Sequence, residues 1–246
     1  MKALVTGANK GIGYGIAKAL GAKGYELYIG ARDENRGQKA AADLTALGYK
    51  AEFVKIDLND FSTFEPAAVK LDGLDLLVNN AGISGNISTE RGQLDMEKSA
   101  FEYTTEDLRE TVEINFLATH ELIKTFLPHL AEDAKILNVT IPVTAVYWQP
   151  LAYVTSKAAQ NVMTNAFGHE FEKQGSKRQI FGVMPGAVAT DLNGLNVGDF
   201  GGMAKSPEQA GQEITSFLFD GKNHNGHLVE YTGKEVTTYE TQLGFE

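Results

Sequence analysis

A tyrosine and a lysine four residues apart form the pair in this chain best suited to move a proton. Tyr153 and Lys157 lie in a segment whose apolar spacing predicts a helix over about 153–172. Residues four apart on a helix share one face, so the phenol and the ammonium should be neighbours. A nearby ammonium favours the phenolate and lowers the pKa of a tyrosine from about 10 toward neutrality. The pair therefore predicts a general acid or base.

A glycine-rich turn near the N-terminus is suited to binding an anion. Residues 6–13 read Thr-Gly-Ala-Asn-Lys-Gly-Ile-Gly and lie between the first predicted strand and the first predicted helix. Glycines allow the backbone to approach a pyrophosphate closely, and the N–H groups and dipole of the following helix attract its charge. The turn predicts a nucleotide site whose contacts are Gly7, Asn9, Lys10, Gly11, Ile12 and Gly13.

A parallel sheet must position these groups. Short runs rich in Val, Ile and Leu alternate with segments of helical period, which is typical of βαβ units with both faces of the sheet covered. We expect one doubly wound α/β domain over 1–246, with substrate loops near 83–103 and 187–205 at the carboxyl ends of strands. Helix N-caps are expected at Thr104, with Asp107, and at Ser206. The seven predicted strands cover 2–5, 26–29, 51–56, 74–78, 135–139, 179–183 and 226–229.

Composition excludes several classes of protein. Lys plus Arg is 22 and Asp plus Glu is 32, and the net charge of −10 argues against a nucleic-acid partner. The absence of cysteine excludes disulfides, iron–sulfur clusters and a thiol nucleophile. Among five histidines only His224 and His227 are close in sequence, in a polar loop, so no metal is expected. Neither a secretory leader nor an apolar run of about 18 residues is found, which predicts a cytoplasmic protein without a membrane span.

Several motifs, taken together, resemble the short-chain dehydrogenase/reductase family. After the Gly-x-x-x-Gly-x-Gly turn come four further motifs in the family's order: Asn79-Asn80-Ala81-Gly82, Asn115, Tyr153-x-x-x-Lys157 and Pro185-Gly186-x-Val188-x-Thr190. The resemblance implies a Rossmann-like sheet of about seven strands in the order 3-2-1-4-5-6-7, with helices on both faces. The segment 31–38 and the long 83–103 loop look more specifically like NADPH-dependent carbonyl reductases.

The resemblance also implies roles for individual residues. Lys157 should hydrogen-bond the nicotinamide ribose as well as act on Tyr153, and Asn115 should anchor a water chain that relays protons. Asp57, beside Leu58, should contact the adenine, although a loop cap is an alternative reading of this carboxylate. Further contacts with the dinucleotide are expected from Leu58, Asn80, Ala81, Gly82, Tyr153, Lys157, Pro185, Gly186, Val188 and Thr190.

The choice of dinucleotide depends on the end of the second strand. An enzyme that selects NAD needs a carboxylate there to hold the ribose 2′-hydroxyl, but this chain has Ala31 followed by Arg32. The guanidinium of Arg32 suits a 2′-phosphate, and Lys10 adds a second cation, so NADP(H) is predicted. Asp33 leaves NAD(H) open, because a shift of one residue would bring its carboxylate to the ribose.

The hydroxyl that polarises a substrate carbonyl is ambiguous. In the family it is a serine about 13 residues before the tyrosine, which corresponds here to Thr140, our expected donor. Alignment on Asn138-Val139 instead puts Ile141 at that position, which would remove the donor. Thr144 is a weaker substitute.

These features predict an NADPH-dependent reductase of ketones or aldehydes, with Tyr153 as proton donor. The residues before Tyr153 are apolar and include Trp148, a candidate wall of the pocket or part of the core, so the small-molecule carbonyl substrate should be apolar. Reduction of an activated C=C bond, or sensing of NADP(H) without turnover, are the alternatives. The resemblance implies a homodimer or homotetramer formed through the helices at 105–130 and 153–172.

Overall fold

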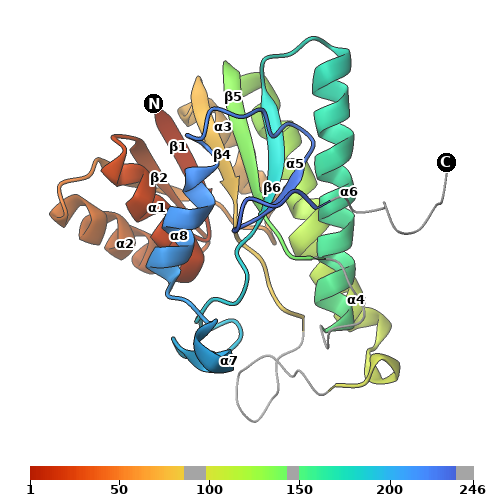
Figure 1. Ribbon diagram of the computed structural model, residues 1–246. Coiled ribbons are helices and arrows are strands. Elements are labelled where there is room, and N and C mark those ends of the chain that lie inside the picture. Colours follow the sequence, from red (N-terminus) through yellow and green to blue (C-terminus); the bar gives the residue numbers. More distant parts are fainter. Residues whose placement is uncertain (86–97, 143–149, 237–246) are drawn as a thin grey trace.

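Seven parallel strands form a single sheet in the order β3-β2-β1-β4-β5-β6-β7 (Figure 1). The structure is a computed structural model that describes residues 1–85, 98–142 and 150–236. It confirms the α/β class and the strand order that the family resemblance implied. The strands are β1 (Lys2–Thr6), β2 (Glu26–Ala31), β3 (Ala51–Lys55), β4 (Leu74–Asn79), β5 (Leu130–Val139), β6 (Gln179–Met184) and β7 (Leu228–Glu230).

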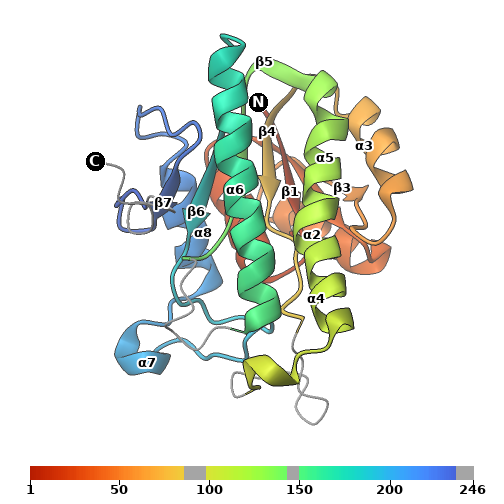
Figure 2. The same cartoon turned by 90° about the vertical axis from the view of Figure 1, so that its right-hand side faces the viewer.

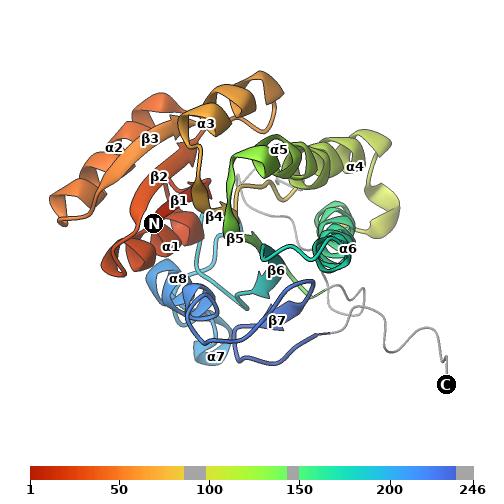
Figure 3. The same ribbon diagram turned by 90° about the horizontal axis from the view of Figure 1, so that it is seen from above.

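Helices cover both faces of this sheet (Figures 2 and 3). Successive residues of a strand point to opposite faces, so Ala3 and Val5 of β1 pack under α1, α2 and α8, whereas Leu4 packs on the side of α3, α5 and α6. The helices are α1 (Gly11–Ala22), α2 (Glu34–Ala46), α3 (Phe64–Lys70), α4 (Thr105–Val112), α5 (Ala118–Phe126), α6 (Leu151–Lys173), α7 (Asp199–Gly202) and α8 (Pro207–Ser216). Short 3₁₀ turns lie at Phe61–Thr63, Ala100–Glu102 and Leu127–His129.

Local sequence signals account for most of the boundaries. Thr104 and Asp107 form a reciprocal capping box at the start of α4, and the Ser206 hydroxyl accepts the Gln209 N–H at the start of α8. Strand β5 begins at Leu130, five residues before the predicted start, and its pairing with β4 is irregular between Leu74 and Leu76. Glu132 and Asp133 separate Leu130 and Ala131 from the later apolar run, so apolar content alone did not reveal this part of the strand.

The predicted helix at 105–130 is interrupted. Between α4 and α5 the chain forms a π-helical turn, Glu113–Leu117, which contains Asn115. Such turns are rare and are frequently found at functional sites. Asn115 in this turn is fully buried and accepts the backbone N–H of Ile83, in the segment that follows β4.

Helices α1 and α8 touch through glycine. A Cβ on Gly15 would lie 2.1 Å from the carbonyl oxygen of Pro207, and one on Gly211 would lie 2.2 Å from the carbonyl carbon of Gly15. Only hydrogen fits at both positions, so the two backbones approach more closely than side chains would allow. The contact fixes the helix that begins at the glycine-rich turn.

Candidate active site

The glycine-rich turn between β1 and α1 has the geometry of an anion site. Gly7 and Gly11 have φ values of 65° and 57°, which favour glycine, and a Cβ on Gly13 would lie 2.5 Å from Asn80 Nδ2. Lys10, the N-cap residue of α1, makes no side-chain cap, and the first turn holds no acidic residue. The first N–H groups of α1 are therefore available to a phosphate.

The turn after β4 is tied to this glycine-rich turn. Thr6 Oγ1 accepts the backbone N–H groups of Asn80 (3.0 Å) and Ala81 (3.1 Å), and Asn80 Nδ2 donates to the Thr6 carbonyl (3.0 Å). The Asn80 side chain thus holds two strand ends together. The predicted contact of this amide with the ribose stays a prediction.

At the end of β2, Arg32 and Asp33 have different surroundings: the Arg32 side chain is exposed, whereas the Asp33 carboxylate is bonded to α2. Arg32 is exposed, and Lys55 Nζ, from the end of β3, donates to the Arg32 carbonyl. Asp33 is the N-cap of α2, where it accepts the Arg36 N–H at 2.8 Å, and this bond is the main reason why the pKa of Asp33 is lowered. A carboxylate in this role is engaged with its own helix.

Asp57 has a similar local role. Its Oδ1 accepts the backbone N–H of Asn59 at 3.1 Å, and Leu58 beside it is buried. This geometry agrees with the loop cap that we gave as the alternative for Asp57. Its contact with adenine is untested.

An ion pair joins the glycine-rich turn to the segment after β6. Lys10 Nζ lies 2.8 Å from Asp191 Oδ2, and both side chains are exposed. A Cβ on Gly11 would lie 3.7 Å from the Thr190 methyl group, so the two predicted cofactor segments are adjacent. The cation that sequence analysis assigned to a phosphate therefore has a protein carboxylate as its partner here.

The segment Pro185–Thr190 packs against Tyr231 and is hydrogen-bonded to the backbone of Lys205. A Cβ on Gly186 would lie 2.9 Å from the Tyr231 ring, and Lys205 Nζ lies 3.3 Å from the centroid of that ring. The Lys205 ammonium also pairs with Glu213, and its backbone bonds Ala187 and Ala189. Val188 is buried, and Thr190 Oγ1 donates to Asn193 Oδ1 at 3.2 Å.

Tyr153 and Lys157 share the first turns of α6, as predicted, but burial dominates their protonation. Lys157 Nζ is 5.9 Å from the Tyr153 ring centroid and donates to the carbonyl of Val139 (2.8 Å) and to Gln160 Oε1 (3.0 Å). Burial raises the pKa of Tyr153 to about 12 and lowers the pKa of Lys157 to about 8. The expected fall in the Tyr153 pKa is wrong for this structure, because removal from water disfavours the phenolate.

Neither candidate for the carbonyl-polarising hydroxyl is a free donor. Thr140 is 1% exposed, and its Oγ1 donates to Asn161 Oδ1 on α6 at 2.5 Å. Ile141 has no hydroxyl, and Asn161 Nδ2 donates to its carbonyl at 3.2 Å. A Thr140 hydroxyl that reaches a substrate must first give up its bond to Asn161. Thr144 and Trp148 lie outside the described residues.

Asn115 joins three elements beneath the site. Its Oδ1 accepts the Ile83 N–H (2.8 Å), and its Nδ2 donates to the Ile83 carbonyl (2.8 Å) and to Ser156 Oγ (2.9 Å). This amide fixes the chain after Gly82 against α6. A role in proton relay stays a prediction.

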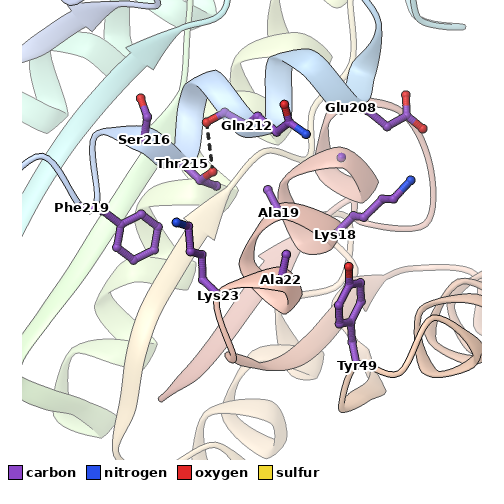
Figure 4. A pocket seen from close by; sticks show the side chains of 11 residues that line it. Lys18, Ala19, Ala22, Lys23, Tyr49, Glu208, Gln212, Thr215, Ser216 and Phe219 are labelled. Carbon is purple, nitrogen blue, oxygen red and sulfur yellow. Dashed lines mark hydrogen bonds between the residues drawn. The ribbon is translucent and has the colours of Figure 1, made fainter.

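The cavities lie to the side of these residues. One of about 510 Å³ lies between α1, α8 and Tyr49, where Lys23 Nζ is 5.4 Å from the Phe219 ring centroid (Figure 4), and no predicted site residue lines it. Another of about 310 Å³ is lined by Lys205, Tyr231 and residues 197–198 and 202–204 of the predicted substrate loop. Within the described ranges, no group of three or more His, Asp or Glu is arranged to hold a metal, and no helix is long and apolar enough to cross a bilayer.

A profile of short chain dehydrogenases matches residues 1–197. The chain belongs to the short chain dehydrogenase family. Within this family, L-2,3-butanediol dehydrogenase of Corynebacterium glutamicum is 31% identical over 202 residues, which are 77% of this chain and 72% of that protein. Mouse carbonyl reductase (NADPH) 1 is 34% identical, over 56% of this chain and 48% of that protein.

Solved structures agree with this assignment to the short chain dehydrogenases. A short chain dehydrogenase from Burkholderia cenocepacia in complex with NADP superposes with a TM-score of 0.77 and 26% identity, covering 93% of this chain and 94% of that one. A dehydrogenase/reductase from Sinorhizobium meliloti gives a TM-score of 0.79 and 25% identity, covering 93% and 92% of the two chains. The relatives are oxidoreductases, and the open N-terminus of α1 and its glycine cradle fit the nicotinamide dinucleotide that the family binds.

Sequence reasoning missed several residues that complete the site. Asp191, Gln160 and Asn161 are hydrogen-bond partners of predicted residues, whereas Lys205 and Tyr231 support the segment after β6. Gln160 and Asn161 lie on the buried face of α6 in the structure, and the apolar spacing of the sequence did not single them out. Contacts made from distant loops leave no comparable signal in the sequence.

Proposed function

We propose that this chain reduces the carbonyl group of a ketone or aldehyde with NADPH, and that Tyr153 donates the proton. The observation that carries the proposal is the pair formed by half-buried Tyr153 and buried Lys157, whose ammonium is bonded to the Val139 carbonyl at the carboxyl end of β5. The NADPH named for mouse carbonyl reductase and the NADP bound to the Burkholderia cenocepacia structure support the cofactor.

The raised pKa of Tyr153 suits this residue to donate a proton. When bound, the reduced nicotinamide supplies the hydride whose electron pair makes the new C–H bond. With a pKa of about 12, Tyr153 is a neutral phenol at pH 7 and gives its proton to the carbonyl oxygen as the C=O bond becomes a C–O–H group. The Lys157 ammonium lies close enough to stabilise the phenolate that remains.

The cations at the end of β2 support NADP(H) rather than NAD(H). Arg32 is exposed, Lys55 is bonded to its backbone, and the Asp33 carboxylate that sequence analysis left open caps α2. A 2′-phosphate meets two positive charges there, and a ribose hydroxyl meets no free carboxylate among the described residues of this corner.

The test follows NADPH absorbance with a panel of ketones, aldehydes and enones, using the wild type and Tyr153→Phe. Turnover of ketones or aldehydes that falls at least 100-fold in the variant supports the proposal. Tight binding of NADPH without turnover of any substrate would instead indicate a sensor. Val162→Ala, an exposed change farther along the same helix, is the control and should leave turnover intact.

A second function is favoured by the hydrogen bond between Thr140 and Asn161. If no hydroxyl polarises a carbonyl, an activated C=C bond is the easier substrate, since its carbonyl need not become an alkoxide. Ile141→Ser would restore a donor, and we expect it to raise kcat for ketones tenfold or more, because one such donor contributes on the order of 100-fold. Thr140→Val is the companion variant. A large loss in Thr140→Val, with no gain in Ile141→Ser, would assign the donor to Thr140.

A further inference from the structure

One face of α6 is buried against the sheet and yet is polar. Ser156, Lys157, Gln160, Asn161 and Thr164 are each at most 3% exposed. A helix that packs on a sheet usually presents apolar side chains there. Burial of a polar group costs free energy unless the group is hydrogen-bonded. The hydrogen-bond partners of these side chains therefore indicate their role.

Gln160 holds the ammonium of Lys157. Its Oε1 accepts from Lys157 Nζ at 3.0 Å, and the carbonyl of Val139, at the end of β5, accepts from the same nitrogen at 2.8 Å. An ammonium has three N–H donors. Two of them are thus fixed by the described residues, and one is left for the side of Tyr153, whose ring centroid is 5.9 Å away.

We propose that Gln160 is a positioning residue of the proton-transfer pair, whose amide oxygen fixes the Lys157 ammonium without neutralising its charge. The inference rests on the proposed function and deepens it. A carboxylate at position 160 would give the same geometry but would cancel the positive field at the phenol. An amide orients the ammonium and leaves that field intact.

The other groups around Lys157 are also uncharged. Strand β5 contributes the Val139 carbonyl, the π-helical turn contributes the Asn115 amide through its bond to Ser156, and α6 itself contributes the Tyr153 ring. Burial is the cause of the lowered Lys157 pKa, without a contribution from a neighbouring charge. The described site therefore keeps carboxylates away from this lysine.

The experiment measures the titration of Lys157 directly by NMR of the full-length chain, in which lysine carries ¹³C at Cε. The Lys157 signal is assigned by its loss in Lys157→Met. Gln160→Met, of similar length but without the acceptor, should lower the midpoint by at least half a pH unit, and Gln160→Glu should raise it by at least one unit. Thr164→Val is the matched control, because Thr164 bonds the backbone of Gln160 rather than its amide.

Equal midpoints in the wild type, Gln160→Met and Gln160→Glu would overturn the proposal, as would a shift in Thr164→Val as large as that in Gln160→Met. If Gln160→Met does not fold, Gln160→Glu alone decides, because it keeps both size and acceptor. The titration needs no turnover, so it stands even if Tyr153→Phe shows that the proposed function is wrong. Where turnover is found, Gln160→Glu should shift the pH profile of kcat to higher pH with little change in KM.

Discussion

At the scale of single residues, the site is defined by which partner each charged group has. The ammonium of Lys10 is bonded to Asp191, and that of Lys157 is bonded to two neutral oxygens. The Lys10 ammonium is exposed and its charge is neutralised by the Asp191 carboxylate. The Lys157 ammonium is buried and has no neighbouring carboxylate among its bonded partners. Removal of the partner of Lys10 should therefore change the affinity for NADPH, whereas the buried charge of Lys157 should change the stability of the fold.

Removal of the Asp191 carboxylate should strengthen the binding of NADPH. Asp191→Asn frees Lys10 for a phosphate, and because exposed ion pairs contribute about 0.2–1 kcal/mol, we expect the Kd to fall by a factor of about 1.4 to 5 at low salt. The measurement is a titration of NADPH fluorescence, repeated with NADH. Asp43→Asn breaks an exposed pair with Lys39 on α2 and is the control. Weaker binding in Asp191→Asn would mean that the pair closes the site over the nucleotide.

Lys157 should make the stability of the fold depend on pH. Its pKa is about 8 in the folded chain and 10.5 when exposed, so the unfolded state binds the proton more tightly between these values. Relative to Lys157→Met, the wild type should gain up to about 3 kcal/mol as pH rises from 8 to 10.5, and lose it again on return. Urea unfolding of both proteins checks this. Relative to Lys39→Met, the wild type should instead lose stability as pH rises, because the bond to Asp43 raises the pKa of Lys39.

The chemistry of residues was predictable from spacing, but their environment was not. The four-residue interval placed Tyr153 and Lys157 on one helix face correctly. The direction of the Tyr153 pKa shift depends on burial, which comes from the packing of α6, and the partner of Lys157 comes from β5. No local pattern in the sequence reports either of these.

At the scale of elements, the sequence predicted all seven strands because each is a short apolar run between turn signals. It missed the first part of β5, where Glu132 and Asp133 interrupt the apolar residues, and the π-helical turn at Glu113–Leu117, which differs from an α-helix by one residue. The parts that were missed depend on tertiary contacts, such as those between Asn115, Ile83 and Ser156.

The contact of α1 with α8 should couple stability to the nucleotide site. In Gly211→Ala the new methyl group would lie 2.2 Å from the Gly15 backbone, so the helices must separate. We expect a loss of about 3 kcal/mol of stability and weaker NADPH binding, because α1 carries the glycine-rich turn. Urea unfolding and NADPH titration measure the two effects. Gln212→Ala, an exposed change on the same helix, should alter neither, and unchanged NADPH affinity in a destabilised Gly211→Ala would contradict the coupling.

At the scale of the whole molecule, the predicted cofactor segments come from both halves of the chain. The glycine-rich turn, the turn after β4 and the segment after β6 meet at the carboxyl ends of the parallel strands, where Gly7 approaches Ala81 and Gly11 approaches Thr190. A ligand that touches all of them binds the folded chain and not the unfolded one. Its binding energy is then added to the stability of the fold.

NADPH should therefore raise the melting temperature of the whole chain. At a concentration 100 times its Kd it contributes about 2.7 kcal/mol, and a chain of 246 residues has an unfolding entropy near 0.5 kcal/mol per kelvin, so we expect a rise of about 5 °C. NADH at the same concentration should give a smaller rise, because it lacks the phosphate that Arg32 and Lys55 would meet. Scanning calorimetry with each nucleotide measures the difference, and Arg32→Ala should reduce the NADPH shift toward that of NADH. A larger rise in melting temperature with NADH would contradict the predicted preference for NADPH. It would mean that a carboxylate, and not these cations, binds the ribose.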